Sequence, residues 1–501
     1  MRIKVLNGEY RGGRALRYAG FVDHAFQEGL GATLTVEDPS YGREIDSFPG
    51  LSLAQFDAAI AAARRAFDRG NWSECSVRDR AAMLRRFVDA LSRKAQNIAD
   101  LVVAEAGCPR HTPVMRSQVQ APLRQAPEII DLFLSLPDVE DNPLPLAERI
   151  TPLGQSVQSL RRYTPIGVVA AIAAYNFPFF TALWKVMPAL IAGNTVILRP
   201  SPLTPLSALI FGEAAAEAEL PPGVLNVVVE PGFEGARLLT THPAVDMVAF
   251  TGSSAVGARV MAQVAPSMKR LQLELGGKSA QIFLPDALDR VTTMASSVCT
   301  SHAGQGCALG TRVFVPQERK AELLEQMAAA FERIRVGAAD DPQTQMGPVI
   351  SAAQRERCEH FVALAVEHGA RVASGGRRPR HLAHGYYFEP TLLALPDNSN
   401  PAAQEEIFGP VVSVIGYRDI DHVVAMANDS RFGLSGYVYG QDRQLAIKVG
   451  LRVKSGTVNV NAGIMSTYIS SGGQRASGIG RERGIEGLRL YQQLSCLNLG
   501  G

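Results

Sequence analysis

The sequence has little of what marks secreted, zinc-binding or membrane proteins. Its 501 residues include only six cysteines, and these form no CxxC pair. We therefore expect neither a disulfide framework nor a metal site, and a reducing compartment fits best. No apolar run reaches the roughly 20 residues that span a membrane. The arginine-rich start lacks the apolar stretch of a targeting peptide, so we expect a cytoplasmic protein that starts at its own Met1.

The chain also lacks a large excess of charge of either sign. Its formal net charge is +2, with 50 basic and 48 acidic residues. This balance gives no electrostatic reason to expect a nucleic acid or an anionic membrane as partner. The hydrophobic share of 46% and the mean hydropathy of +0.03 are ordinary for a globular enzyme. A chain of this length is expected to form two or three domains.

Two helices are predicted near the start of the chain. Ser52 and Gln55 form a capping-box pattern before an amphipathic stretch that ends near Gly70. A second helix is predicted from Ser76 to Gly107, where a glycine is followed by a proline. Both stretches indicate surface-packed helices with no chemistry of their own.

From Gly167 onward, strand patterns alternate with helix patterns. GVVAAIA, TVILRP, VLNVVV and MVAFTGS are continuous apolar runs of strand length, separated by helical segments. Such runs indicate strands that are covered on both faces. Alternation of this kind predicts right-handed crossovers and a parallel, doubly wound sheet, which binds ligands at the carboxyl ends of its strands.

A second alternating region begins at SAQIFLP and predicts a second α/β domain. Between the early helices and the first sheet, the acidic, proline-containing segment VEDNPLPLAERI indicates a linker or a projecting arm. The tail RLYQQLSCLNL alternates apolar and polar residues, as an edge strand does, and could pair with another chain.

Chemically notable residues lie near the predicted strand ends. Asn176 follows the first strand, and Gly252 and Gly257 bracket a helix start where a phosphate could bind, although an ordinary turn is as good a reading. Glu274 lies in an apolar run before two glycines, as a salt-bridged glutamate or a functional one would. Cys307 could be a nucleophile or a buried structural thiol. The structural role is expected for the other cysteines: Cys75, Cys108, Cys299, Cys358 and Cys496.

Taken in order, these motifs resemble the aldehyde dehydrogenase superfamily. The matching stretches are PIGVVAAIAAYNFP, FTGSSAVG, LELGGKSA, GQGC, EEIFGPVV and GGQRASGIGRE, and the resemblance runs from about Asn7 to the final strand. It implies an α/β fold with a Rossmann-type parallel sheet in the cofactor domain, an α/β catalytic domain and a small oligomerisation arm. The implied boundaries are 1–137 and 159–275 for the dinucleotide-binding domain, 276–479 for the catalytic domain, and 138–158 with 480–501 for the arm and tail strand.

The resemblance also implies a reaction in which an aldehyde becomes a carboxylic acid. The Cys307 thiolate attacks the aldehyde carbon to give a thiohemiacetal, whose oxyanion is held by the Asn176 amide and the Cys307 backbone N–H. The nicotinamide cofactor accepts the hydride, and a thioester remains. Glu274 is the matching general base for the hydrolytic water. Lys185 matches a lysine near the proton path, and His302 has no implied role.

Cofactor residues are implied in the same way, with NAD as the expected cofactor and NADP as a possibility. Two departures from the family pattern bear on this choice. RPSP stands where relatives often have KPxE, so the usual acidic residue is missing and an arginine suited to a phosphate is present. Tyr175 replaces a common tryptophan. The matched positions are Ala174, Tyr175, Arg199, Ser201, Pro202, Gly232, Gly252, Ser253, Gly257, Glu406 and Phe408.

A third departure concerns the proton path, and a fourth concerns the substrate pocket. Ile485 stands where many relatives have a glutamate, and the neighbouring Glu486 is a candidate to replace it. An aromatic wall is also lost, which predicts a roomy apolar pocket for a bulky or aromatic aldehyde. The matched pocket positions are Phe177, Phe180, Trp184, Gly306, Ala308, Tyr468 and Ser471.

Three alternative functions stay open at this point. A CoA-acylating dehydrogenase generally lacks the Glu274 base, whereas a cysteine-dependent esterase would use the same thiol and oxyanion hole without a dinucleotide. A non-catalytic binding member of the same fold would not need Asn176, Glu274 and Cys307 together. A homodimer or homotetramer is expected, because oligomers are the family norm and the arm and tail strand are natural exchange elements.

Overall fold

The first of the two large sheets carries most of the predicted chemistry at its strand ends. The computed structural model describes residues 3–6, 9–12, 18–463 and 465–500, so Met1 and Asn7 lie outside the described part. In the first sheet the five central strands are parallel and the edge strands are antiparallel. In spatial order the strands are β21 (Gly478–Ile479), β13 (Arg270–Glu274), β12 (Met247–Thr251), β9 (Val168–Ile172), β10 (Thr195–Arg199), β11 (Leu225–Val228), β3 (Gly20–Val22) and β4 (Ala25–Gln27).

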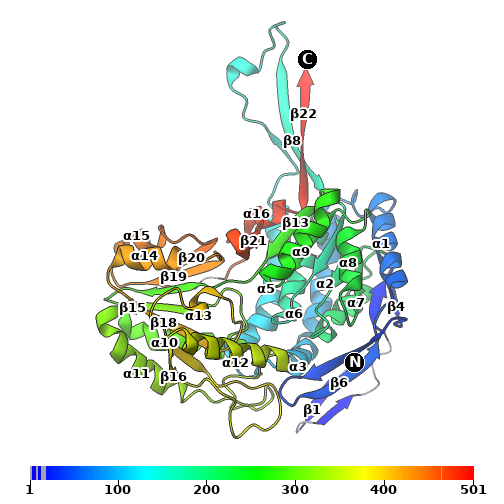
Figure 1. The fold of residues 1–501 in the computed structure, drawn as a ribbon. Helices are drawn as coiled ribbons and strands as arrows, with labels where there is room; N and C mark the ends of the chain where they lie inside the picture. Colours follow the sequence, from blue (N-terminus) through cyan, green and yellow to red (C-terminus); the bar gives the residue numbers. More distant parts are fainter. Residues whose placement is uncertain (1–2, 7–8, 13–17, 464, 501) are drawn as a thin grey trace.

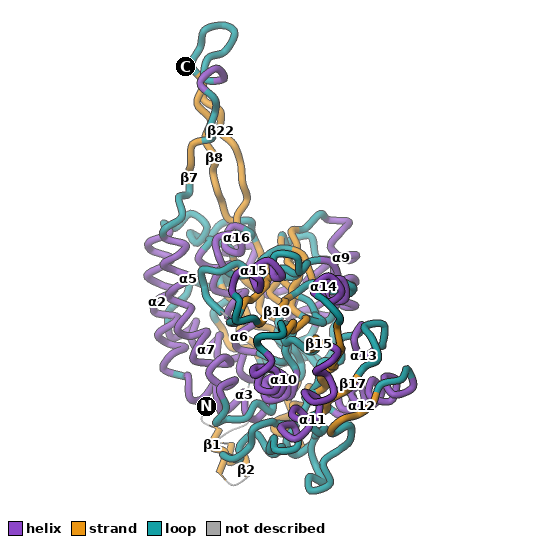
Figure 2. Tube along the Cα trace, turned by 90° about the vertical axis from the view of Figure 1, so that its left-hand side faces the viewer, coloured by secondary structure: helices purple, strands orange, loops and turns teal. Residues whose placement is uncertain are grey.

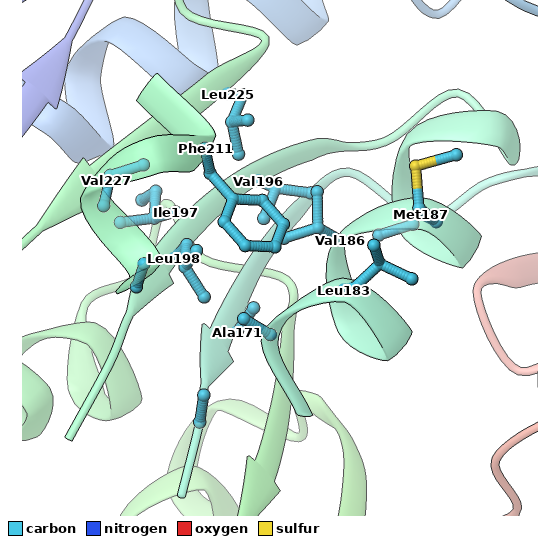
Figure 3. Packing of buried hydrophobic residues seen from close by; sticks show 14 of the residues in the cluster. Ala171, Leu183, Val186, Met187, Val196, Ile197, Leu198, Phe211, Leu225 and Val227 are labelled. Atoms are coloured by element: carbon cyan, nitrogen blue, oxygen red, sulfur yellow. The ribbon is translucent and has the colours of Figure 1, made fainter. Parts of the chain in front are cut away.

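Helices cover both faces of this sheet, as the continuous apolar strands require. One face is covered by α1 (Leu53–Asp68), α8 (Glu234–Thr241) and α9 (Ser254–Val264). The other face is covered by α6 (Pro178–Ile191) and α7 (Leu206–Glu217), with α2 (Val77–Arg93), α3 (Ala95–Ala106) and α5 (Ala121–Leu134) packed outside them. Figure 3 shows Phe211 of α7 packed among Val196, Leu198 and Leu225 of the strands. The predicted doubly wound architecture is confirmed.

The predicted start of the first early helix is confirmed, whereas the predicted length of the second is not. Ser52 caps α1 in the predicted capping box with Gln55. The single helix predicted from Ser76 to Gly107 is wrong, because α2 ends at Arg93 and α3 begins at Ala95, with Lys94 as the cap residue between them. The Lys94 side chain pairs with Glu213 and Glu217 of α7. Contacts with α7, which local periodicity does not report, accompany the break at this residue.

The second sheet forms the core of the other half of the molecule. Its strands are parallel except for the edge strand β16. Separate apolar clusters fill its two faces, one with α10 and α11 and the other with α12, α14 and α15. In spatial order its strands are β16 (Arg371–Ser374), β17 (Thr391–Ala394), β18 (Val411–Tyr417), β15 (Arg312–Pro316), β14 (Ala280–Phe283), β19 (Ser435–Tyr439) and β20 (Thr457–Val460). Its helices are α10 (Val291–Thr300), α11 (Lys320–Phe331), α12 (Ala352–Glu367), α13 (Pro401–Gln404), α14 (Ile420–Asn428) and α15 (Arg443–Gly450).

A three-stranded arm projects from the body of the molecule (Figures 1 and 2). It consists of β7 (Val139–Asp141), β8 (Val157–Pro165) and β22 (Gln492–Gly500), with β22 antiparallel to β8 along its whole length. The arm pairing continues to Pro165, beyond the predicted limit of the arm at residue 158, and the domain boundaries stay predictions. Where the chain is described, no helix has both the length and the apolar character needed to cross a membrane.

The remaining elements are short and connect the larger ones. They are β1 (Ile3–Leu6), β2 (Glu9–Gly12), β5 (Thr33–Asp38), β6 (Arg43–Pro49), α4 (Pro113–Met115), the π-helical turn Arg116–Gln120 and α16 (Gly484–Arg489). The chain leaves β9 on one side to form β10 and β11, and then crosses to form β12 and β13 on the other side. The carboxyl ends of β9 and β12 therefore border the crevice at which such sheets bind their ligands.

Candidate active site

Cys307 lies on a loop between α10 and β15 that has an unusual backbone. His302, Ala303 and Gly304 have positive φ values of 54°, 52° and 73°. Such backbone is rare outside glycine and is kept only where surrounding contacts require it. A side chain at Gly304 would collide with the carbonyl oxygen of Gly409, so this turn packs tightly against the loop that follows Phe408. The result is a tightly packed loop on which Cys307 is partly exposed as a residue.

Gln305 holds this loop from inside. Its Nε2 donates to the carbonyl of His302 at 3.1 Å, and its Oε1 accepts from the backbone N–H of Ile350 at 2.9 Å. The side chain is fully buried. On the other side of the nucleophile, the Tyr437 hydroxyl donates to the carbonyl of Ala308 at 3.0 Å. The backbone around Cys307 is thus fixed on both sides.

Asn176 reaches the same loop from the end of β9. Its Nδ2 donates to the carbonyl oxygen of Gln305 at 2.8 Å, two residues before Cys307, and the side chain is 5% exposed. The carbonyl of Asn176 itself accepts from Nε2 of Gln118 at 2.8 Å. One N–H of the amide is used by the loop, which leaves the second N–H as a possible donor to a substrate oxygen.

Glu274 is the last residue of β13, and the glycines after it explain its position. A Cβ at Gly277 would lie 2.7 Å from the carbonyl oxygen of Cys307, so only glycine lets this turn approach the nucleophile loop. A Cβ at Gly472 would lie 2.9 Å from Oε1 of Glu274. That Oε1 atom is buried and has no hydrogen-bond partner among the described residues. The carboxylate is thus close to the nucleophile loop, and its Oε1 is unpartnered within the described part of the chain.

Lys185 lies behind Glu274 in a cluster of charged groups. It is completely buried, and its Nζ lies 2.9 Å from Oε1 of Glu482. The interpretation of Glu486 as the replacement carboxylate is wrong, because Glu486 bonds instead to the hydroxyl of Ser470. Glu482 belongs to the GRE motif, and its backbone pairs with Ser471, which directs its side chain to Lys185. The structure therefore supplies the missing carboxylate from the preceding turn.

Arg483 is a further cation of this cluster. Its guanidinium carbon lies 5.1 Å from the ring centre of Phe180 and 4.9 Å from that of Trp184. Its Nε is buried and has no partner among the described residues. The guanidinium therefore covers two of the aromatic residues that were matched to the substrate pocket, as a cation over aromatic faces does.

The electrostatics of the cluster favour protonated forms at rest. Removal from water, and then the negative charge of Glu274 and its neighbours, raises the pKa of the Cys307 thiol to about 12. Burial and the Glu482 carboxylate raise the pKa of Glu274 well above its ordinary range, although Lys185 and Arg483 oppose this. A raised pKa makes the Glu274 carboxylate a stronger base, which suits general base catalysis.

The residues matched to the nicotinamide half of the cofactor surround the same loop. Glu406 Oε1 accepts from the N–H of Gly277 at 2.9 Å, and burial raises the pKa of Glu406 to about 7. The ring of Tyr175 meets that of Phe408 edge to face, with centroids 5.9 Å apart. Ala174 directly precedes Tyr175. These contacts join the β9 loop of the first half to the second half of the molecule.

The residues matched to the pyrophosphate lie at the start of α9. Ser253 is the N-cap, and its hydroxyl accepts from the N–H of Val256 at 3.3 Å. Ser253 and Val256 are exposed, so the amides of the first turn face solvent, where a phosphate could reach them. A side chain at Gly257 would collide with Leu275, so glycine brings the helix onto the strand that follows. This arrangement fits a dinucleotide.

Arg199 is not the free cation that the sequence implied. Its guanidinium is paired with the carboxylate of Glu230, at 3.1 Å from Nε and 3.0 Å from Nη2. The expectation that an acidic residue is missing here is therefore wrong, since Glu230 arrives from the segment after β11. Ser201 and Pro202 follow Arg199 and are partly exposed, and Gly232 has open space where a side chain would stand.

The residues matched to the substrate pocket divide into two groups. Phe177 and Phe180 are partly exposed, with ring centroids 6.2 Å apart, and Gly306 and Ala308 are also partly exposed. Trp184, in contrast, is fully buried. The second group lies on the segment before α16: Tyr468, which is 58% exposed, and Ser471, whose hydroxyl donates to the carbonyl of Glu482.

Sequence reasoning missed four residues of this site. Glu482 and Gln305 lie within motifs that were recognised, so a partner for Lys185 and an anchor for the loop could have been sought there. Arg483 is next to Glu482 and carried no separate signal. Glu230 could not have been found, because nothing in its local sequence points to Arg199.

Comparison with known proteins identifies this arrangement. A model of the aldehyde dehydrogenase family matches residues 26–496. Geranial dehydrogenase of Castellaniella defragrans is 37% identical over 91% of this chain and 93% of its own length, and betaine aldehyde dehydrogenase of Rhizobium leguminosarum bv. trifolii is 36% identical over 96% of both. A mutant of aldehyde dehydrogenase C from Pseudomonas syringae, solved in complex with NAD⁺ and octanal, superposes with a TM-score of 0.89 at 33% identity and covers 96% of both chains.

Proposed function

The chain belongs to the aldehyde dehydrogenase family and is an NAD(P)-dependent aldehyde dehydrogenase, and on this premise we propose that it uses NAD⁺ to oxidise a bulky apolar or aromatic aldehyde to the carboxylic acid. The observation that carries the proposal is that Asn176 and Glu274 approach the Cys307 loop from two neighbouring regions of one sheet. A packing role would not require an amide, a carboxylate and a thiol at the same place.

The Cys307 sulfur is the nucleophile in this proposal. Once Glu274 has lost its own proton by way of Lys185 and Glu482, its carboxylate accepts the Cys307 proton as the carbon–sulfur bond forms, and the carbonyl oxygen becomes an oxyanion. The second N–H of Asn176 and the backbone N–H of Cys307 donate to that oxygen, and losing one such donor typically costs about 10²–10³ in rate. NAD⁺, when bound, supplies the hydride acceptor. The product on the enzyme is a thioester of Cys307.

Glu274 then acts as the base for hydrolysis. Glu274 first releases the proton taken from Cys307 by way of Lys185 and Glu482. Its carboxylate then accepts a proton from the water that attacks the thioester, and the Cys307 thiolate leaves. Transfer of the acyl group from Cys307 to the thiol of coenzyme A, instead of to water, would not need this carboxylate. Lys185 and Glu482 form the buried ion pair through which the proton passes away from the site. Hydrolysis to the free acid is the outcome that these residues favour.

The proposed substrate class is supported by the residues beside the nucleophile and by two of the relatives. Gly306 and Ala308 are small and partly exposed, and Phe177 and Phe180 supply aromatic surface. Relatives include proteins described as acting on geranial and as binding octanal, both long and apolar, and another described as acting on betaine aldehyde. Because the last substrate is small and charged, family membership alone does not select the substrate.

An aldehyde panel with both cofactors tests the proposal. We expect kcat/KM for aromatic and long aliphatic aldehydes to exceed that for acetaldehyde by about tenfold or more, as several buried methylene groups provide. Cys307→Ala should abolish turnover while cofactor binding persists. Comparable kcat/KM values for acetaldehyde and a benzaldehyde-type substrate would contradict the proposed substrate class.

We also propose that the protein is a cytoplasmic homodimer or homotetramer that is joined through its arm. β22 is an edge strand of the arm, and Leu494, Leu497 and Leu499 on it are 48%, 53% and 42% exposed. Apolar side chains on an open edge favour pairing with another chain. Light scattering at micromolar concentration measures the mass, and a monomer would contradict this proposal.

A further inference from the structure

Arg199 and Glu230 form a buried ion pair at the carboxyl end of the first sheet. Arg199 is the last residue of β10, and Glu230 follows β11. Both are 6% exposed. The guanidinium donates through Nε and Nη2 to Oε1 of Glu230, and Nη2 also donates to the carbonyl of Gly232. The face of Arg199 that could bind an anion is therefore occupied by the protein itself.

The Glu230 carboxylate also accepts hydrogen bonds from the first backbone amides of α8. Oε2 of Glu230 accepts from the N–H of Gly235 at 2.7 Å, and Oε1 accepts from the N–H of Ala236 at 2.9 Å. Both amides belong to the first turn of α8. An arginine fork combined with the amides of a helix N-terminus is a donor set that binds phosphate. Here Glu230 fills the place that a phosphate would take.

The position of this pair in the sheet indicates which phosphate would bind there, namely the 2′-phosphate of a dinucleotide. In dinucleotide-binding sheets, an acidic residue near the end of the second strand bonds the adenosine ribose hydroxyls, whereas an arginine there accepts a 2′-phosphate. β10 is the strand that follows β9 and its crossover helix, so Arg199 occupies that place. Without Glu230, Arg199 would be suited to NADP⁺.

We propose that Glu230 is a specificity-determining residue that makes this enzyme select NAD⁺ over NADP⁺. Its carboxylate neutralises Arg199 and occupies the α8 amides, and it would repel a 2′-phosphate of the same charge. Other dinucleotide-binding folds carry an acidic residue at the end of the second strand. Here the acidic group is Glu230, which lies between β11 and α8. The inference rests on the proposed use of NAD⁺ by this site and adds the residue that decides between the two cofactors.

Binding of two cofactor fragments tests this without any turnover. The fragments are ADP and 2′,5′-ADP, which differ in where the second phosphate is attached, and binding is measured by titration calorimetry on the full-length protein. We expect the native protein to bind ADP more tightly. Glu230→Gln should tighten 2′,5′-ADP binding by about 10- to 100-fold, the range for one charged hydrogen bond, and leave ADP binding within about threefold.

Two further variants make the result specific. Glu234→Gln is the matched control, because Glu234 is an exposed carboxylate at the first position of the same helix and makes no contact with Arg199 in the structure. It should leave both affinities unchanged. Adding Arg199→Met to Glu230→Gln should remove the gain in 2′,5′-ADP binding, since the phosphate then has no guanidinium to meet.

Several results would overturn the inference. One is a native protein that binds 2′,5′-ADP as tightly as ADP, a measurement that needs no variant to fold. Another is an unchanged preference in Glu230→Gln, or an equal gain in Glu234→Gln. If neither fragment binds the native protein, the proposed use of NAD⁺ fails as well. If the fragments bind as expected but no aldehyde is oxidised, only the proposed substrate class and reaction fail.

Discussion

Two buried carboxylates at the same edge of one sheet have opposite surroundings. Glu230 receives donors on both oxygens, from a guanidinium and from two backbone amides. Glu274 leaves Oε1 without a donor and lies in the negative field of Glu482. A carboxylate that receives donors on both oxygens is suited to recognising the charge of a ligand, whereas an unpartnered carboxylate with a raised pKa is suited to exchanging protons. The contrast separates a residue that selects the cofactor from one that reacts.

The largest expected effect comes from removing the reactive carboxylate. Glu274→Gln should lower kcat by about 10²–10⁴, the usual contribution of a general base. Glu274 also takes the Cys307 proton before hydride transfer in the proposed mechanism, so the burst of NADH in stopped-flow absorbance should keep an amplitude equal to the enzyme concentration but form more slowly than in the native enzyme. Glu230→Gln should leave kcat with saturating NAD⁺ close to that of the native enzyme. A burst that forms at the native rate would show that Glu274 acts in hydrolysis alone.

The two carboxylates should differ almost as strongly in their contribution to stability. Glu230→Ala leaves the buried guanidinium of Arg199 without its partner, which typically costs about 3–5 kcal/mol in the free energy of unfolding. Glu274→Ala removes a carboxylate that is poorly compensated, so the same measurement should show little loss or a gain. Urea denaturation of both variants beside the native protein measures the difference. Equal losses would contradict the contrast drawn between the two groups.

The difference in pH-dependent stability between the native protein and Glu274→Gln should report Glu274. The folded protein holds the proton of this carboxyl group at pH values where the unfolded chain has lost it, because its folded-state pKa is raised. The native protein should therefore lose stability relative to Glu274→Gln as pH rises above the ordinary carboxyl value, by at most about 1.4 kcal/mol for each pH unit crossed. The loss should level off above the folded-state pKa. Tm measured for both proteins across a pH series provides the test, and a constant difference would contradict it.

The smallest expected effect concerns Arg483, the cation that faces Glu274. Arg483→Leu removes a guanidinium over Phe180 and Trp184, a contact worth about 0.5–2 kcal/mol. It also removes a positive field that lowers the pKa of Glu274, so the pH profile of kcat should move to higher pH. Arg483→Lys should keep most of the native profile. A profile that stays in place in both variants would show that Arg483 acts only in packing.

The parts of the fold that the sequence predicted are those decided by neighbours along the chain. Continuous apolar runs indicated the buried strands, and Ser52 with Gln55 indicated the start of α1. The break at Lys94 was not predicted, because it accompanies ion pairs with a helix more than 100 residues away. Element type followed from local pattern, whereas this boundary depended on packing.

The candidate site shows the same division. Cys307, Glu274 and Asn176 were identified from motifs, and their positions near strand ends follow from the order of strands and helices. Glu486 was the candidate for the proton-path carboxylate, but Glu482 is the residue that pairs with Lys185, since the direction of its side chain is set by its backbone pairing with Ser471. The charge state around Arg199 was also misjudged.

By itself, the sequence determined the family, the doubly wound α/β fold and which residues are candidates for the chemistry, because these depend on residue type and on spacing along the chain. Only the tertiary structure decided which charges meet. Arg199 finds Glu230 across 31 residues, and Lys185 finds Glu482 across 297. The physical reason is that a buried charge requires a partner within hydrogen-bond reach, and that distance is set by how the chain folds in space.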